Sequence, residues 1–217
     1  MTDASSPAPA RQSTGYVPAV LGVVAYAATV ASIRHAKDSD KAPSMALRVD
    51  LLRMAAHRVD SFAKVDSLCA QQGWQAASLA DLFRGSLGDF DERLRPADWA
   101  ERLLKTYLSL GLLSDFCQAL ASGAPEDLGG PLSQVVGEGS FESLAVAQLL
   151  PGIEADPQLA GRLGLWGRRV VGEEIGTLLG VLATFPSLLE GPADREDLHE
   201  TLSQGAVRRM RGIGLRV

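Results

Sequence analysis

The sequence predicts an all-α protein built as a bundle of packed helices. Apolar residues recur at alternating spacings of three and four over long segments, which is the pattern of helices that pack side by side. Strong helix starts, such as Asp156-Pro157, separate these segments. Between them we find no strand-like alternation of apolar and polar residues. The 217 residues, 46% of them hydrophobic, suit one compact domain.

The first half of the chain predicts two long helices and an irregular segment. Residues 1–16 form a tail rich in Ser, Pro and Ala that we expect to be disordered, so the domain spans residues 17–217. A first helix runs over 17–37 and ends in the turn DSDKAP. A second runs over 44–72, with Ser44 as its N-cap and Gly73 as its stop. In the irregular stretch 74–95, Ser78 and Asp81 delimit a short capped turn.

The second half predicts four more helices. The third begins at Pro96, a favoured first-turn residue, and ends near Ser122. The fourth, over 131–150, is weakened by two internal glycines. The fifth begins at Asp156-Pro157 and ends before Pro186, and the sixth covers 194–211.

The apolar seams of these helices identify the residues that face inward. On the second helix the seam includes Arg58, and on the fourth it includes Glu138. Charged residues are unusual on such a seam, because burying a charge is costly unless it is paired. The predicted seams are Leu21, Val24, Ala28 and Ala31; Leu51, Met54, Arg58, Ser61, Val65 and Leu68; Leu103, Tyr107, Leu110, Ser114 and Cys117; and Val135, Glu138, Phe141 or Glu142, Ala145 and Leu149.

Composition restricts the cell compartment and the partners. No charged residue lies between Arg11 and Arg34, but this segment is rich in Ala, Gly and Thr, and the preceding tail is not basic. We therefore expect a helix buried in a bundle, with no membrane, and neither a signal sequence nor a membrane span. Cys69 and Cys117 form no C-x-x-C pair, which favours a reducing cytoplasm. The net charge of −5 argues against nucleic-acid binding.

Four blocks of the sequence resemble a known family. The chain is similar to actinobacterial ferritin-like proteins related to tRNA methylthio-isopentenyladenosine hydroxylase, over residues 17–215. This resemblance implies a ferritin-like four-helix bundle with additional C-terminal helices. The blocks are LGVVAYAATVASIRHAKDSDKAPSMALRVDLLRMAAHRVDSF, DWAERLLKTYLSLGLLSDF, DPQLAGRLGLWGRRVVGEE and RRMRGIGL.

The resemblance also implies where a di-iron site would lie. Such a site takes carboxylates from two helices and a Glu-x-x-His pair from each of two others. Of the six corresponding positions only Glu138 is a metal-ligating residue, so the site looks lost and we expect no metal, no cofactor and no catalytic residue. The six positions are Ala28, Arg58, Ser61, Leu110, Glu138 and Phe141.

Arg58 and Glu138 therefore form a candidate buried pair. We hypothesise that the guanidinium group occupies the former metal cavity and meets the surviving carboxylate. The alternative is that Arg58 reaches solvent or the end of the bundle.

Other titratable residues give weaker candidates. Glu196 and His199 form the only Glu-x-x-His pair, on the last helix, where we expect a solvated face and no metal. We expect the same of His57 and Asp60. We place His35 at the end of the first helix, where an imidazole meets the helix dipole.

The remaining acidic and basic residues predict no catalysis and no tRNA site. Glu173 and Glu174 are adjacent, so at most one faces inward, and Asp115 lies alone on the third helix. We expect the arginines near helix ends to cap carbonyl groups without binding nucleic acid. These are Arg168, Arg169, Arg208, Arg209, Arg211 and Arg216.

Three classes of function follow from the sequence. The first is a non-catalytic ferritin-like protein, a pseudoenzyme that acts by association with itself or with an intact ferritin-like homologue. Its apolar surface would come from the first helix or from residues 74–90. The alternative is a di-iron hydroxylase or oxidoreductase, with a rearranged iron site, that acts on tRNA or a small molecule. A third class is a protein attached to a membrane by its first helix.

Overall fold

The computed structural model describes residues 15–87, 94–137 and 141–216, and no strand occurs among them. The all-α prediction is confirmed. In chain order the elements are α1 (Tyr16–Lys41), α2 (Met45–Gln71), α3 (Ala76–Asp81), α5 (Trp99–Ser122), α6 (Glu126–Gly137), α7 (Phe141–Ala155), α8 (Pro157–Thr184), the 3₁₀ helix η1 (Pro186–Leu189) and α9 (Arg195–Gly212).

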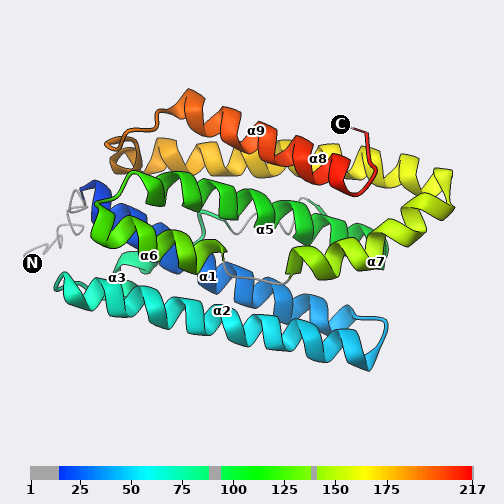
Figure 1. The fold of residues 1–217 in the computed structure, drawn as a ribbon, viewed down its shortest axis with the longest axis horizontal. Helices are drawn as coiled ribbons and strands as arrows, with labels where there is room; N and C mark the ends of the chain where they lie inside the picture. Colours follow the sequence, from blue (N-terminus) through cyan, green and yellow to red (C-terminus); the bar gives the residue numbers. More distant parts are fainter. Residues whose placement is uncertain (1–14, 88–93, 138–140, 217) are drawn as a thin grey trace, which may run out of the picture.

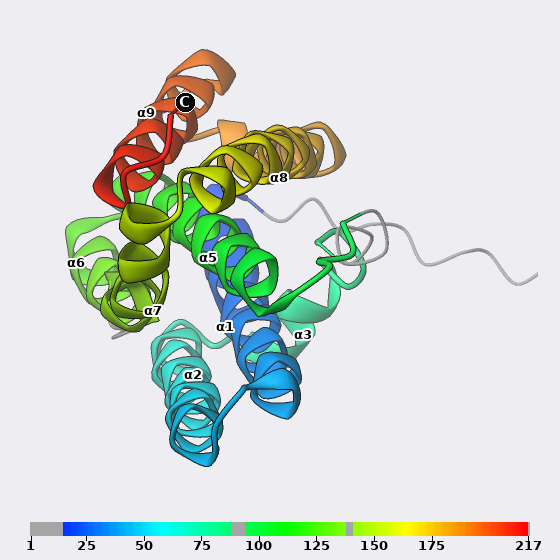
Figure 2. The same ribbon diagram turned by 90° about the vertical axis from the view of Figure 1, so that its right-hand side faces the viewer.

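The long helices lie roughly parallel to one axis (Figure 1). In the end-on view, α1 and α5 lie at the centre of the bundle, with α2 beside α1 at the edge of the molecule (Figure 2). The fourth position of the bundle is filled by α6 and α7, which follow one another along α5. On the other side α5 is covered by α8 and α9, which are the predicted additional C-terminal helices.

Several helix ends follow directly from local sequence and are confirmed. The Ser44 side chain accepts a hydrogen bond from the Leu47 amide at 3.2 Å, and Asp156 caps α8 in the same way. Asp194 forms a capping box with Asp197 at the start of α9. Gly73, after α2, has φ +77°, a conformation that strongly favours glycine.

The predicted turn DSDKAP is wrong in its first four residues, which continue α1 to Lys41. Asp38 is buried there and accepts a hydrogen bond of 2.6 Å from the Thr106 hydroxyl of α5. This tertiary contact stabilises helix where local sequence favours a turn. His35 consequently lies inside α1, so the prediction that it ends the helix is also wrong.

Two other helix starts differ from the prediction. The third long helix begins at Trp99, because Asp98 caps the Glu101 amide at 2.9 Å and excludes Pro96 from the helix. The short turn expected from Ser78 is the helix α3, which begins at Ala76. The Ala76 amide donates to the Asp66 carboxylate of α2 at 3.1 Å, so this cap comes from another helix.

The single helix predicted over 131–150 is wrong, because the chain forms two helices there, α6 and α7. α6 ends at Gly137 and α7 begins at Phe141. Glu138 lies in residues 138–140, outside the described residues. The predicted disordered tail lies outside them up to residue 14, whereas Tyr16 begins α1 and donates its hydroxyl to the Leu120 carbonyl at 2.6 Å.

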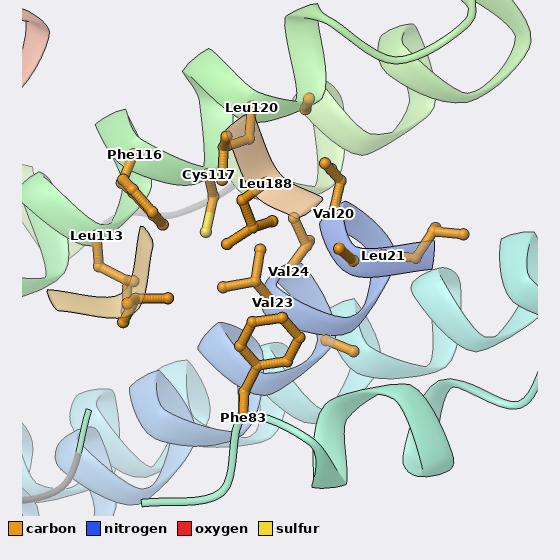
Figure 3. Close-up of a cluster of buried hydrophobic side chains, with 14 of the residues drawn as sticks. Val20, Leu21, Val23, Val24, Phe83, Leu113, Phe116, Cys117, Leu120 and Leu188 are labelled. Carbon is orange, nitrogen blue, oxygen red and sulfur yellow. The ribbon is translucent and has the colours of Figure 1, made fainter. Parts of the chain in front are cut away.

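The apolar core closes around α1. One cluster contains Val20 and Val24 of α1 and Phe116 of α5 (Figure 3). Leu188 of η1 and Phe83, which follows α3, belong to the same cluster. A Cβ at Gly22 would lie 2.8 Å from the Leu79 carbonyl oxygen, so glycine allows α3 to approach α1 closely. By length and composition α1 is the one described helix able to cross a membrane, and half of its apolar window is buried in the bundle.

Candidate functional site

A small cavity lies at the centre of the bundle, between α1, α2, α5 and α6. Its volume is about 50 Å³ and most of its lining is apolar. The positions that the family resemblance assigns to metal ligands on α1, α2 and α5 all face it. These four residues are Ala28, Arg58, Ser61 and Leu110.

Arg58 is the charged residue of this cavity among the described residues. It is half-buried and also lines two neighbouring hollows, of about 90 and 410 Å³, that lead toward α7 and the surface of α2. Its positive charge opposes the rise that burial causes in the pKa of Cys117, and it adds to the lowering that burial causes in the pKa of His35. Arg58 therefore lines the central cavity from α2 and is at the same time half-buried.

The chain resembles known ferritin-like proteins over most of its length. The sequence model of the ferritin-like domain of actinomycetes matches residues 11–186. This range covers the four-helix core and α8. The chain belongs to this family. No curated protein matches the chain.

The ferritin-like fold makes a di-iron site the first chemistry to test against these residues. Two iron ions need several anionic oxygens and two imidazoles. The four cavity positions instead hold a methyl group, a guanidinium, a hydroxyl and an isobutyl group. Among the described residues there is no group of three or more His, Cys, Asp or Glu side chains that could hold a metal ion. The described residues do not fit a di-iron centre.

The remaining polar groups of the cavity have structural roles. The Ser61 hydroxyl donates to the His57 carbonyl, four residues earlier, at 3.1 Å. Burial raises the pKa of the Cys117 thiol to about 12, although the nearby Arg58 opposes this shift. Cys117 is thus a neutral thiol at physiological pH, and neutral thiols are poor nucleophiles and poor metal ligands.

His35 lies beside the cavity and is almost completely buried. Its ring packs against Phe141, with the ring centroids 4.7 Å apart. Burial, and then the charges of Arg58 and Arg34, lowers its pKa to about 3. His35 is therefore a neutral imidazole of α1 that packs against Phe141 of α7, and it does not lie at the helix end where we expected it to meet the helix dipole.

Sequence reasoning missed a second charged region, which we call the polar cluster. It consists of Arg34 and Asp38 of α1, Arg102 and Thr106 of α5, and Glu174 of α8. Asp38 accepts from Thr106 at 2.6 Å and from Arg102 at 3.3 Å. The Arg34 guanidinium lies 3.9 Å from the Glu174 carboxylate. The available signal was the four-residue spacing of Arg34 and Asp38, which places both on one helix face.

Of the adjacent glutamates, Glu174 is buried and Glu173 is half-buried, so one faces fully inward, as predicted. Glu196 and His199 are both exposed on α9, which agrees with a solvated face. Asp60 is exposed, whereas His57 is half-buried and lines the outer hollow beside Arg58. The structure therefore brings none of these candidates into the cavity.

Arg209 makes a tertiary ion pair with two hydrogen bonds, whereas Arg208 lies 3.9 Å from the same Asp115 carboxylate. The two terminal nitrogens of Arg209 donate to both oxygens of Asp115 on α5, at 2.5 and 2.9 Å. A Cβ at Gly111 would overlap Arg209, and one at Gly205 would overlap the carboxylate. Two glycines thus make room for a bidentate pair that joins α9 to α5. The prediction that Arg209 only caps a helix is wrong.

Proposed function

We propose that this chain is a ferritin-like protein without a di-iron centre, and that it acts by association with another protein. The observation that supports this most is the chemistry of the central cavity. The family ligand positions on α1, α2 and α5 line one space, and none of them carries a carboxylate or an imidazole.

The charge of Arg58 strengthens the argument. A guanidinium group stays protonated at every physiological pH, so the cavity wall carries a permanent positive charge. This charge would repel two divalent cations placed beside it. The cavity is also small, about 50 Å³, and its walls are largely apolar. Arg58 therefore acts against metal binding in addition to replacing a ligand.

Three further parts belong to this proposal. The chain is related to the tRNA hydroxylases through the sequence blocks in α1, α2, α5, α8 and α9, and it works in the cytoplasm. Glu138 is the partner of Arg58, which offsets the cost of burying the guanidinium group. Iron-dependent hydroxylation is the competing function, and it requires ligands from outside the four cavity positions.

Association needs an apolar surface that the fold leaves uncovered. The apolar part of α1 packs against α2, α3 and α5, and half of its apolar window is buried. Ile33 is the large apolar residue of α1 that is strongly exposed, so α1 offers a small apolar surface. In the described part of residues 74–90, Phe83 is buried and Leu82 is exposed. The outer face of α2 is the larger candidate. The partner is a second copy of the chain or an intact ferritin-like homologue.

Metal analysis tests the proposed loss of the iron site. The full chain is purified without chelators, and its iron content is measured before and after anaerobic loading with ferrous iron. We expect less than about 0.1 iron per chain, since a di-iron protein approaches two. The variant Glu196→Ala/His199→Ala serves as a control and should give the same value. Near-stoichiometric iron would overturn the proposal and return hydroxylase chemistry to first place.

A further inference from the structure

The outer face of α2 carries an apolar stripe that the described residues leave exposed. Within the described residues six large apolar side chains are strongly exposed, and three of them lie on this helix at intervals of seven: Met45, Leu52 and Val59, at 67%, 47% and 59%. Scattered exposed apolar residues are ordinary, whereas a regular row on one helix is a mark of helix pairing.

Smaller apolar residues complete the row. Val49, Ala56 and Ala63 lie between and after the three large residues, so the spacing alternates between four and three from Met45 to Ala63. This is the a/d pattern of a two-helix seam. At a rise of 1.5 Å per residue the stripe is about 27 Å long.

The stripe is distinct from the face that α2 turns toward its own bundle. The buried residues of that inner face are Leu51, Ala55, Ser61, Val65 and Cys69. The Ser32 hydroxyl of α1 donates to the Ala55 carbonyl at 2.8 Å and marks the side on which α1 lies. Since α2 lies at the edge of the molecule in both views, its outer face is open to a partner (Figures 1 and 2).

We propose that this stripe binds the same stripe of a second copy, with the two α2 helices antiparallel and a twofold axis near Ala56. In this arrangement residues whose distances before and after Ala56 are equal, or differ by one residue, lie close together. Leu52 then packs near Val59 of the second copy, and Val49 packs near Ala63. The two small Ala56 side chains allow close approach at the axis.

The charges that flank the stripe favour this partner and this direction. Arg53 lies three residues before Ala56 and Asp60 lies four residues after it, on the same flank of the stripe. Each Arg53 therefore meets Asp60 of the other copy, which gives two such ion pairs across the interface. A parallel pair would instead bring Arg48 of one copy next to Arg53 of the other, and like charges repel. Arg53 is exposed and its existing contact is with Asp50 on its own helix, at 3.2 Å, so it is able to turn to a new partner.

The size of the stripe sets the expected strength. A helix pair about 27 Å long buries less area than a standard interface, which takes about 800 Å² from each partner. We therefore expect a reversible dimer with a Kd in roughly the micromolar range. This inference rests on the proposed function, because it names the partner in the proposed association, but it does not depend on the iron content.

Sedimentation equilibrium of the full chain over a wide concentration range measures the dimer directly. Leu52→Lys places a charge in the seam and should weaken dimerisation at least tenfold. Leu165→Lys is the matched control, because Leu165 is 66% exposed on α8, away from the stripe, and should leave the Kd unchanged. Circular dichroism checks that each variant remains folded.

A charge exchange tests the direction. Arg53→Asp and Asp60→Arg should each weaken the dimer, because each places like charges opposite one another. The double variant should restore dimerisation to within about threefold of the original, since every contact is again between opposite charges.

Disulfide trapping gives an independent readout. In the antiparallel dimer Ala56→Cys lies opposite itself and should cross-link on mild oxidation, whereas Ala63→Cys should not. The two natural cysteines are buried and should not compete. Efficient cross-linking of both variants would indicate a parallel pair and overturn the proposed geometry.

A monomer at all concentrations, or a dimer that Leu52→Lys and Leu165→Lys affect equally, would overturn the proposal that α2 pairs with α2. A low iron content combined with a monomer would leave the loss of the metal site standing and remove only this partner. A dimer with stoichiometric iron would do the opposite. The two proposals can therefore fail separately.

Discussion

The centre of the bundle and the polar cluster on α1, α5 and α8 hold charged side chains in different ways. The central cavity has Arg58 among apolar and hydroxyl side chains, with no acidic residue among its described lining. In the polar cluster every charged residue has an opposite charge on a neighbouring helix, at distances such as 3.3 Å between Arg102 and Asp38.

The comparison of these two regions shows where this fold retains buried carboxylates. A buried acid is stable when a cation or a hydroxyl from another helix meets it, and Asp38 and Glu174 satisfy that condition. At the centre, ferritin-like proteins with a metal site need acids to hold cations. Here the described positions carry none, whereas the buried acids of the polar cluster join neighbouring helices.

Removal of an acid from the polar cluster should have the largest effect. Asp38→Ala leaves Arg102 and Thr106 without their acceptor, and we expect it to lower the free energy of unfolding by about 3 kcal/mol. Urea denaturation followed by circular dichroism measures this change. Asp81→Ala removes an exposed carboxylate paired with Arg84 and should cost less than about 1 kcal/mol. Equal effects of the two variants would contradict the structural role of Asp38.

The pH dependence of stability should separate His35 from the acids. Its pKa of about 3 in the folded chain lies below the ordinary 6.5, so the unfolded chain binds a proton first as the pH falls. Stability from the neutral imidazole is complete above pH 6.5 and is lost progressively toward pH 3. Between pH 7 and 5 this loss should be about 2 kcal/mol.

The variant His35→Gln has no titrating imidazole and provides the comparison. Its stability should change less between pH 7 and 5 than that of the original chain, by the amount that His35 contributes. Parallel curves of the free energy of unfolding against pH for the two proteins would contradict this prediction. They would show that protonation of His35 does not destabilise the folded chain.

Filling the central cavity should have the smallest effect. Ala28→Val adds two methyl groups next to a space of about 50 Å³, and we expect a change of less than about 1 kcal/mol in the free energy of unfolding. Ala25→Val is the matched control, because Ala25 is completely buried in the packed part of α1. We expect this control to cost about 1–3 kcal/mol. A large loss from Ala28→Val would mean that the centre is as tightly packed as the rest of α1.

Local sequence determined the fold class and several helix boundaries. The seam of α1 is buried as its spacing predicts, and the Ser44, Asp156 and Asp194 caps start their helices. These features depend on contacts between residues at most a few positions apart, so helical periodicity and cap preference suffice to predict them. The spacing also identified Arg58 as an inward-facing charge.

Only the tertiary structure decided which distant groups meet. The extension of α1 to Lys41 depends on Thr106, 68 residues after Asp38, and the role of Arg209 depends on Asp115, 94 residues earlier. His35 has a neutral side chain because other helices bury it, and nothing in its own helix predicts that. A buried charge or hydrogen-bond donor is stabilised by whatever the packing of helices brings to it, and this partner has no fixed spacing in the sequence.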